Sequence, residues 1–376
     1  MLTKGDDYPI HQTSEPIAYS GTDRNFYDRY WFNGYVPDGS IFFAVAFGIY
    51  PHVNIADAHI AVVVDGVQHN LHASRVLHME RMDIEVGPIK IVIEEPLKRL
   101  RVVVSNGEGI SADLVFEGRS FPIEEPRFIH RVGPRSLMDY TRMTQNGRWN
   151  GWIEVDGVRH TLPADAVGTR DRSWGVRPIG AGDMQPYAPA RAPGFFWQWC
   201  PLNFADKSLF YHINADADGH PYNLRSVLVP DDAAPDEMIH TSDARMEVEL
   251  QPGLRHAAKG LLTLNFSGHP EMRIRFEPFL RFQMAGIGYF NPDWIHGGYR
   301  GDLKVVRDQY KLDQLDLNNP QFLHIQALSR VTLETDGSAP QHGVGAFEQL
   351  ILGPYHPYGL GDTADSYGFL AAKPSN

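Results

Sequence analysis

Cysteine is nearly absent from this sequence, because Cys200 is the only one among 376 residues. A single cysteine cannot form an internal disulfide, so the sequence excludes a small disulfide-stapled extracellular scaffold. Residues 1–12 also lack the basic start and the apolar run of a secretory signal peptide. The longest apolar candidate, residues 40–50, is shorter than the roughly 18 residues that a membrane-spanning helix needs. We therefore expect a cytoplasmic protein without a transmembrane segment.

Positive charge is also scarce. The 34 Lys and Arg residues face 46 Asp and Glu residues, which gives a formal net charge of −12. Nucleic-acid binding needs clustered Lys and Arg to neutralise phosphates, so this balance argues against a nucleic-acid partner. Apolar residues make up 43% of the chain and aromatic residues 11%, which is ample for sizeable cores. At roughly 100–200 residues per domain, the length favours two domains.

Helical periodicity is rare, and residues 302–316 are a window in which we expect a helix. No alternation of strands and helices is visible, which argues against a Rossmann fold or a TIM barrel. The sequence also lacks a G-x-G-x-x-G fingerprint, a P-loop, a G-x-S-x-G elbow and an H-E-x-x-H motif. None of the 17 His residues has a ligand spacing typical of a metal site. We therefore expect no cofactor and no metal.

Short segments rich in Val, Ile, Phe, Tyr and Trp are abundant, and Gly, Asp, Asn and Pro separate them. In residues 244–250, apolar and acidic residues alternate, as in a half-buried antiparallel strand. Asp-Gly pairs at 65–66 and 156–157 are typical of tight hairpin turns. The sequence predicts an all-β protein. The Pro-rich segment 178–193 interrupts the strands, so we place one β-domain at 1–179 and a second at 180–376.

Three segments carry a resemblance to a known family: "GTRDRSWGVRP" (168–178), "FFWQWCPLNFADKSLFYHINADADG" (195–219) and "FEQLILGPYHPYGL" (347–360). They are similar to the hydroxyneurosporene synthase, or carotenoid 1,2-hydratase-like, superfamily. The resemblance implies two tandem antiparallel lipocalin-like barrels, in a superfamily that includes hydratases and cyclases. It also implies that Asp171, Ser173 and Trp174-Gly175 end the first barrel. Arg172 departs from the pattern, since relatives commonly carry His or Asn near this position.

The first of these segments is the first candidate site. Adjacent strand residues point to opposite faces, so Asp171 and Ser173 share one face, and Arg170 and Arg172 share the other. In one interpretation, Asp171 and Trp174 line a cavity, and nearby cations keep the carboxylate ionised. In the other, Asp171 caps backbone amides and Trp174 closes the end of the barrel.

A second candidate site lies in residues 290–302, which contain Asp293, Trp294, His296, Tyr299 and Arg300. A carboxylate and an imidazole can share general acid–base work, because His titrates near neutral pH. The Trp and Tyr rings suit a hydrophobic substrate or a cationic transition state. The alternative is an aromatic-rich loop that only closes the second barrel.

A third group lies in residues 195–222. Alternation places Trp197 on one face of its strand, and places Tyr211 and His212 on opposite faces of the next. Such aromatic stripes are usually core, but the core of a lipocalin-like barrel doubles as a ligand cavity. We interpret residues 216–222 as a hairpin turn, because they lack the ligand set of a calcium loop. Cys200 is expected to be buried packing.

The leading hypothesis is a cofactor-independent enzyme that acts on a hydrophobic small molecule of isoprenoid, steroid-like or aromatic type. Hydration or dehydration, isomerisation or cyclisation would take place in a cavity at the junction of the two domains. Asp171, Asp293 and His296 are the predicted acid–base residues, and Arg172 or Arg300 would hold a carboxylate or carbonyl group. Two alternatives stay open: a non-catalytic lipid or isoprenoid carrier, and a structural or interaction module. A homodimer is compatible with the sequence. The remaining predicted substrate-binding residues are Trp174, Trp197, Tyr211, His212, Trp294 and Tyr299.

Overall fold

Hairpins closed by Asp-Gly pairs organise the first half of the chain. The computed structural model describes residues 1–19, 21, 23–182 and 194–361. Asp65 and Gly66 both have positive φ values, of 49° and 75°, and they join two paired strands at the predicted position. Asp156 and Gly157 close a second hairpin in the same way, with φ values of 51° and 82°. The predicted all-β class is confirmed.

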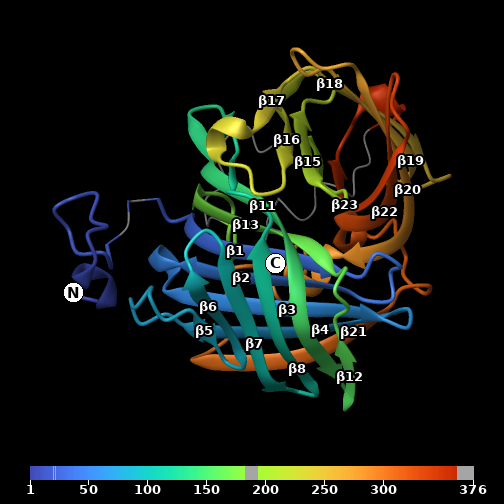
Figure 1. Cartoon of the computed structure of the whole chain (residues 1–376). Helices are drawn as coiled ribbons and strands as arrows, with labels where there is room; N and C mark the ends of the chain where they lie inside the picture. The colour runs from blue at the N-terminus through green and yellow to red at the C-terminus, as the bar shows by residue number, and fades with distance from the viewer. Residues whose placement is uncertain (20, 22, 183–193, 362–376) are drawn as a thin grey trace.

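The first sheet has 14 strands in the order β21-β4-β3-β2-β1-β13-β11-β8-β7-β6-β5, with β9, β10 and β12 paired to β11 (Figure 1). Its strands are antiparallel, and the sheet curls into a half-barrel. The bounds are β1 Phe26–Tyr35, β2 Phe42–Tyr50, β3 Ile55–Val64, β4 Val67–Val76, β5 Glu85–Val86, β6 Ile89–Glu95, β7 Arg99–Gly107, β8 Ile110–Gly118, β9 Ile123–Glu124, β10 Phe128–Val132, β11 Arg135–Val155, β12 Val158–Thr161, β13 Val167–Val176 and β21 Leu303–Lys311.

The second sheet has nine antiparallel strands in the order β17-β16-β15-β14-β23-β22-β20-β19-β18, and it also curls into a half-barrel. The bounds are β14 Phe195–Asn203, β15 Lys207–Ala215, β16 Pro221–Pro230, β17 Ile239–Thr241, β18 Ala244–Leu250, β19 Ala257–Leu264, β20 Met272–Gln283, β22 Ile325–Thr335 and β23 Gln341–Leu352. The described helices are 3-10 turns: η1 Lys4–Asp7, η2 Pro51–Val53, η3 Pro235–Glu237, η4 Met284–Ile287, η5 Pro320–Phe322 and η6 His356–Tyr358. In the described part of the chain, no helix is long and apolar enough to cross a membrane.

Three large apolar clusters divide the interior. One fills the concave side of the first sheet and a second fills that of the other sheet. The third lies between the sheets and draws on both of them, for example Trp31 on β1 and Trp199 on β14, whose rings pack edge to face at 5.4 Å. Because strand side chains alternate between faces, each central strand contributes to a barrel interior and to this junction. The junction is therefore a third apolar core, between the two others.

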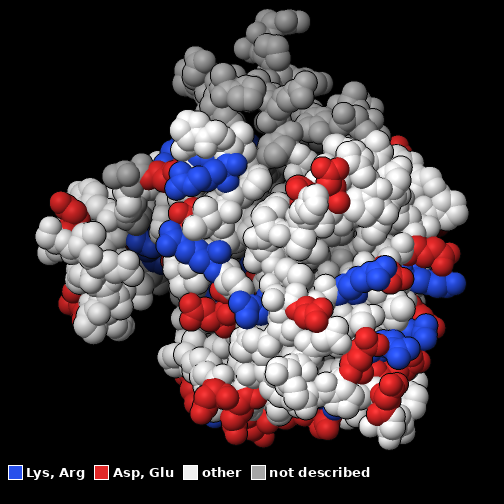
Figure 2. Space-filling view, turned by 90° about the horizontal axis from the view of Figure 1, so that it is seen from above, with Lys and Arg blue, Asp and Glu red and all other residues white. Residues whose placement is uncertain are grey.

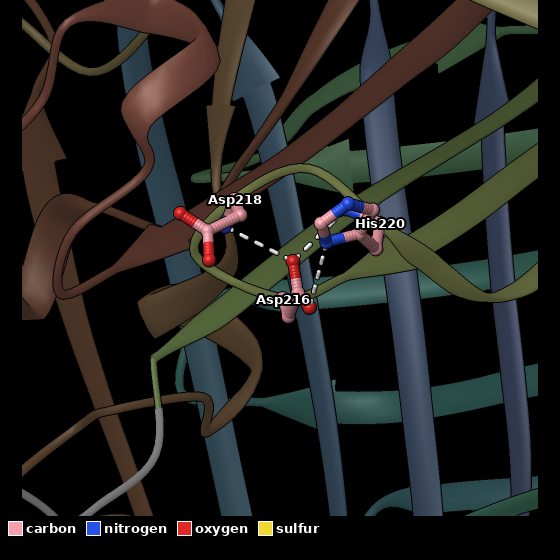
Figure 3. A group of neighbouring side chains, drawn as sticks. All are labelled: Asp216, Asp218 and His220. Atoms are coloured by element: carbon pink, nitrogen blue, oxygen red, sulfur yellow. Dashed lines mark hydrogen bonds and ion pairs between the residues drawn. The ribbon is translucent and has the colours of Figure 1, made fainter.

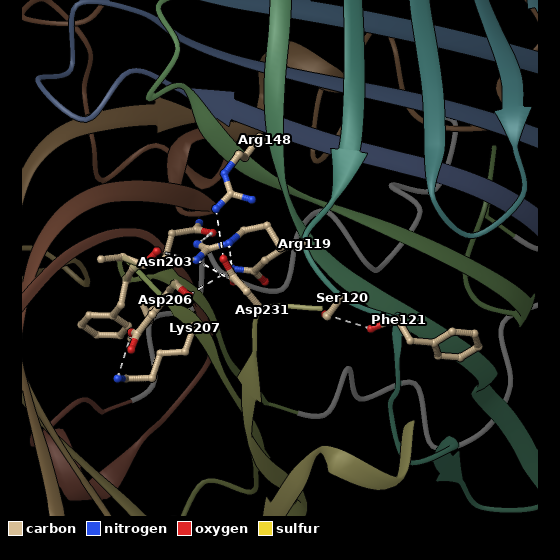
Figure 4. A network of polar contacts seen from close by, with 12 residues as sticks. Arg119, Ser120, Phe121, Arg148, Asn203, Asp206, Lys207 and Asp231 are labelled. Atoms are coloured by element: carbon tan, nitrogen blue, oxygen red, sulfur yellow. Dashed lines mark hydrogen bonds and ion pairs between the residues drawn. The ribbon is translucent and has the colours of Figure 1, made fainter. Parts of the chain in front are cut away.

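The two sheets are also joined by a buried polar network around Arg119, which follows β8 (Figure 4). Its guanidinium donates to Asp231 at 2.9 Å, to Asn203 at 3.2 Å and to the carbonyl of Phe204 at 2.8 Å. All three partners belong to the second half of the chain, at the ends of β14 and β16. This network fixes one edge of the junction.

The helix expected at 302–316 is wrong, because residues Leu303–Lys311 form strand β21. β21 pairs antiparallel with β4, so a segment of the second half of the chain completes the edge of the first sheet (Figure 1). Lys, Arg, Gln and Leu favour a helix locally, but the open edge of β4 offers a full ladder of hydrogen bonds. The division at residues 179 and 180 stays a prediction, and residues 183–193 of the Pro-rich segment lie outside the described residues.

In Figure 2, blue and red groups are interspersed on a largely white surface, and red groups gather along the lower edge. Ion pairs on the surface of the described residues include Arg275 with Glu334 and Arg159 with Glu154. On this face, the described residues form no broad basic patch of the kind that phosphate binding needs.

Candidate active site

Asp171 on β13 faces the junction of the two sheets. In the antiparallel ladder it lies opposite Trp31 on β1 and Thr144 on β11, and directly opposed residues point to the same side of a sheet. Arg170 and Arg172 therefore point into the first barrel, where their guanidiniums lie over the rings of Phe116 and Tyr30. Asp171 is half-buried, and Oδ1 of its carboxylate is buried and accepts no hydrogen bond from the described residues.

The electrostatic setting of Asp171 favours its protonated form. Burial raises the pKa of this carboxyl to about 6, because a buried charge loses its hydration. Arg142 and Arg29 oppose the rise in pKa, while the carboxylates of Glu125 and Glu348 add to it. Both protonation states of Asp171 are therefore populated near neutral pH, which general acid–base catalysis requires.

Glu125, which follows β9, organises one side of Asp171. Its Oε1 accepts hydrogen bonds from Thr144 and, at 3.2 Å, from the indole N–H of Trp199. Its Oε2 lies 3.7 Å from Nε of Arg142 and 3.6 Å from Nδ1 of His212. Burial lowers the pKa of His212, so this imidazole is neutral at physiological pH. The cluster holds Arg142 beside Asp171.

Glu348 on β23 organises the opposite side. Its carboxylate accepts hydrogen bonds from Trp197 at 2.9 Å, His324 at 2.8 Å and Gln326 at 2.7 Å. Burial alone would raise the pKa of Glu348, but these three partners outweigh it and hold the pKa below its ordinary value. This second carboxylate is therefore ionised and fully engaged, in contrast to Asp171.

Arg29 on β1 lies diagonally across the ladder from Asp171, on the same face. Its side chain is buried, and its guanidinium carbon lies 4.7 Å from the ring centre of Tyr289. Its Nη2 donates no hydrogen bond to the described residues, and none of their carboxylates pairs with it within 4.0 Å. The site thus contains an unpaired buried acceptor and an unpaired buried donor on one face.

Of the predicted site residues, Asp171, Trp197 and His212 meet at the junction. Trp197 and His212 stack with ring centres 6.2 Å apart, and Arg142 lies 4.8 Å from the ring centre of Trp197. Tyr211, one position along, faces the interior of the second barrel. These positions follow from the strand alternation that the sequence shows.

His296 lies beside this group, on the segment between η4 and β21. Its Nε2 lies 2.7 Å from the carbonyl oxygen of Ile287, and its ring is 4.8 Å from that of Tyr289. Burial, with the charge of Arg29 next in size, holds the pKa of His296 well below its ordinary value. Asp293 is exposed, and no ion pair joins it to His296 in the described structure. The structure does not bring these two predicted acid–base residues together.

The remaining predicted residues lie away from Asp171. Arg172 pairs with Asp28 inside the first barrel, and Trp174 on the same face is 40% exposed. Trp294 stacks on His72, with ring centres 5.1 Å apart. Tyr299 is exposed, and Arg300 donates to the carbonyl of Tyr299 at 3.1 Å.

The junction residues that the sequence did not reveal are Arg29, Glu125, Arg142, His324 and Glu348. Each is a charged or titratable residue of another segment than β13, and Arg29 lies in β1, which is rich in aromatic residues. A charge inside such a strand is the signal that would have found Arg29, since charged side chains are rarely buried without a partner or a function.

Three residues that could act as metal ligands lie close together elsewhere in the described structure. Asp216, Asp218 and His220 bring one ligand atom each within 4.8 Å of one another, on an exposed turn (Figure 3). Asp216 Oδ1 accepts the backbone N–H groups of residues 218 and 220, at 3.0 Å and 2.9 Å. This arrangement is the hairpin turn between β15 and β16 that the sequence predicts. The Asp216 carboxylate closes the turn, and the Asp218 carboxylate pairs with His356 at 2.7 Å.

A family model described as a family of unknown function, DUF8625, matches residues 2–361. The chain belongs to this family. A search of curated proteins gives no match for this DUF8625 chain. An AttH-like protein from Nitrosomonas europaea has a similar structure, with a TM-score of 0.50 and 12% identity over 91% of this chain and 98% of its own. That similarity shows the fold.

Two further structures are similar to this DUF8625 protein. Kievitone hydratase from Nectria haematococca has a TM-score of 0.46 and 13% identity, over 93% of this chain and 96% of its own. CghA with Sch210972 has a TM-score of 0.49 and 12% identity, over 88% and 89%. The tandem lipocalin-like fold that the resemblance in the sequence implies is confirmed by the similarity to the AttH-like protein.

Proposed function

We propose that this protein is a cofactor-independent enzyme that transfers protons to and from a hydrophobic small molecule at the junction of the two sheets. The observation that carries the proposal is Asp171, a buried carboxyl with one unpaired oxygen and a pKa of about 6. The reaction class is hydration or dehydration, isomerisation or cyclisation. Each of these needs one group that both donates and accepts a proton near neutral pH.

The surroundings of Asp171 fit an apolar substrate with a reacting polar end. Trp31, Trp197 and Trp199 contribute indole rings to the junction. Glu125 and Glu348 accept hydrogen bonds from the indole N–H groups of Trp199 and Trp197, so these carboxylates position the rings rather than react. A group that stays free among engaged neighbours is the expected mark of the reacting one.

The experiment first finds a ligand and then separates binding from turnover. The purified protein is screened by thermal shift against isoprenoid alcohols, steroid enones and flavonoid phenols, and each hit is incubated and followed by mass spectrometry for a change of one water or for an isomer. Asp171→Asn then keeps the shape and polarity of the side chain but cannot exchange a proton. We expect at least a 100-fold loss of turnover with ligand affinity changed less than about threefold.

The matched control is Asp165→Asn, which makes the same change at an exposed aspartate in the turn between β12 and β13. It should retain wild-type turnover. If the wild-type protein binds hits but converts none of them, the carrier interpretation replaces the enzyme. If Asp171→Asn turns over as fast as the control, Asp171 is not the acid–base group.

A further inference from the structure

Arg29 is the least compensated charge at the junction. Its side chain is 2% exposed, and its Nη2 has no acceptor among the described residues. Arginine stays protonated in proteins, so it cannot escape burial by losing its charge. A buried cation needs an anion or a set of hydrogen-bond acceptors. The aromatic face of Tyr289 meets one side of the guanidinium and supplies neither of these.

The other acids near Arg29 are already engaged. Asp57 accepts the hydroxyl of Tyr50 at 3.1 Å and the backbone N–H of Gly297 at 2.6 Å. Asp28, on the opposite face of β1, pairs with Arg172 and Arg81. Asp171 is the remaining neighbour, and its Oδ1 is itself unpaired. Nη2 of Arg29 and Oδ1 of Asp171 thus belong to residues on one face of the sheet, and the residue paired with Arg29 lies two positions from Asp171 on β13.

We propose that Arg29 binds an oxygen of the substrate, a carbonyl or phenolate oxygen that is conjugated to the carbon at which Asp171 transfers a proton. This inference rests on the proposed function and narrows its substrate class to hydrophobic enones and phenols, as opposed to plain hydrocarbon polyenes. The indole rings of the junction would contact the apolar body of the molecule. The guanidinium is suited to the oxygen because it presents several donors in one plane.

The proton and electron balance follows for hydration of an enone. Ionised Asp171 accepts a proton from water while the water oxygen bonds to the β-carbon. The π electrons move to the carbonyl oxygen, and Arg29 stabilises the resulting enolate. Protonated Asp171 then returns the proton to the α-carbon, the carbonyl reforms, and one water has been added. Dehydration is the same sequence in reverse, and Asp171 is regenerated in both directions.

A pair of dyes tests this assignment without knowledge of the natural substrate. The probes are 4-nitro-1-naphthol, whose phenolate absorbs at longer wavelength than the phenol, and 1-nitronaphthalene, which has the same rings without the hydroxyl. Binding beside Arg29 should favour the phenolate, so we expect the bound naphthol to ionise at least one pH unit below the free dye. Arg29→Met should abolish that spectral shift and weaken naphthol binding at least 30-fold. The affinity for 1-nitronaphthalene should change less than threefold.

Arg29→Lys keeps a cation in place and should retain part of the spectral shift, which covers the case in which the Met variant fails to fold. Naphthol binding that is equal in wild type and both variants would overturn the role of Arg29, while the turnover test on Asp171 would still stand. If wild-type protein binds neither dye, the junction is not an organic-ligand site and this inference falls. If Arg29→Met keeps the spectral shift but Asp171→Asn has lost turnover, only the substrate class is wrong.

Discussion

At the scale of single residues, two carboxyls of the junction, Glu348 and Asp171, have opposite electrostatics. Glu348 accepts three hydrogen bonds, so its ionised form is stabilised and its pKa is lowered. The pKa of Asp171 is raised to about 6 by burial. For Glu348, the stabilising contribution is present above its ordinary pKa and is lost as pH falls through the lowered one. The raised pKa of Asp171 has the opposite effect on the free energy of unfolding, which falls as pH rises, and this pH dependence can be measured.

The first prediction concerns the stability of Asp171→Asn. In the unfolded chain Asp171 ionises near its ordinary pKa of 3.8, and in the folded protein near about 6. Between these values the folded protein binds the extra proton, so its free energy of unfolding falls as pH rises. From pH 4.5 to 7.5 the wild type should lose roughly 2 kcal/mol relative to Asp171→Asn. Urea unfolding of both proteins at the two pH values measures this difference, and an unchanged difference would contradict the raised pKa.

The sequence was informative about which way Asp171 points and silent about what it meets. Strand alternation correctly separates Asp171 from Arg170 and Arg172, because that period is a local property of the backbone. Arg29 is 142 residues away, and Glu348 is 177 residues away in the other direction. Their meeting depends on how two sheets pack, which no local pattern encodes. The same limit applies to Asp293 and His296, which are close in sequence although the structure leaves Asp293 exposed and His296 buried.

At the scale of elements, the segment after β20 crosses the face of β3 and β4 before β21 joins the first sheet. Gln68 on β4 holds this segment: its Nε2 donates to the carbonyl of Gln283 at 2.8 Å, and its Oε1 accepts the N–H of Gln283 at 2.7 Å. Side-chain groups thus continue the backbone ladder at a sheet edge. The segment carries Tyr289 and His296 and places both beside Arg29.

The second prediction concerns Gly286→Ala in η4. A Cβ at Gly286 would collide with the side chains of Gln68 and Asn70, which are both buried and hydrogen-bonded to each other at 2.9 Å. We expect a loss of about 2–4 kcal/mol in the free energy of unfolding, because the bonds to Gln283 must break or stretch. Hydrogen exchange should quicken in β21 more than in β14. Gly361→Ala, where a Cβ meets nothing within 4 Å, is the control and should leave both measurements unchanged.

β21 also shows why one element was predicted wrongly. It mixes polar and apolar residues that are all half-exposed or exposed, so no strong two-residue alternation marks the strand. The bonds that make it a strand come from β4, more than 200 residues earlier. The central strands were predictable because burial requires apolar residues in them. An edge strand is held mainly by backbone hydrogen bonds to its neighbour, and these leave little pattern in its sequence.

At the scale of the whole molecule, the two sheets form one body in which each side of the junction depends on the other. Glu125 of the first half accepts a hydrogen bond from the indole N–H of Trp199 in the second half. Asn33 of β1 donates to Gln326 of β22 at 2.9 Å. Asn203 donates to the hydroxyl of Tyr35 at 3.1 Å. The candidate site is therefore complete only when the sheets are docked, and a change that loosens docking should also disturb the site.

The third prediction tests that docking through Arg119 and Arg148, which both bind Asp231 (Figure 4). Arg119 is buried and has further acceptors in the second half of the chain, at Asn203, Phe204 and Ala205. The side chain of Arg148, in contrast, is 51% exposed and bonds to Asp231 at 3.0 Å. Arg119→Ala should lower the free energy of unfolding by about 3–5 kcal/mol, because it leaves buried acceptors without a donor. Arg148→Ala should lower the free energy of unfolding by at most about 1 kcal/mol, because exposed ion pairs contribute little.

Urea unfolding followed by tryptophan fluorescence compares the two variants, since Trp31 and Trp199 at the junction report separation of the sheets. Equal costs for the two variants would mean that the apolar junction alone holds the sheets together.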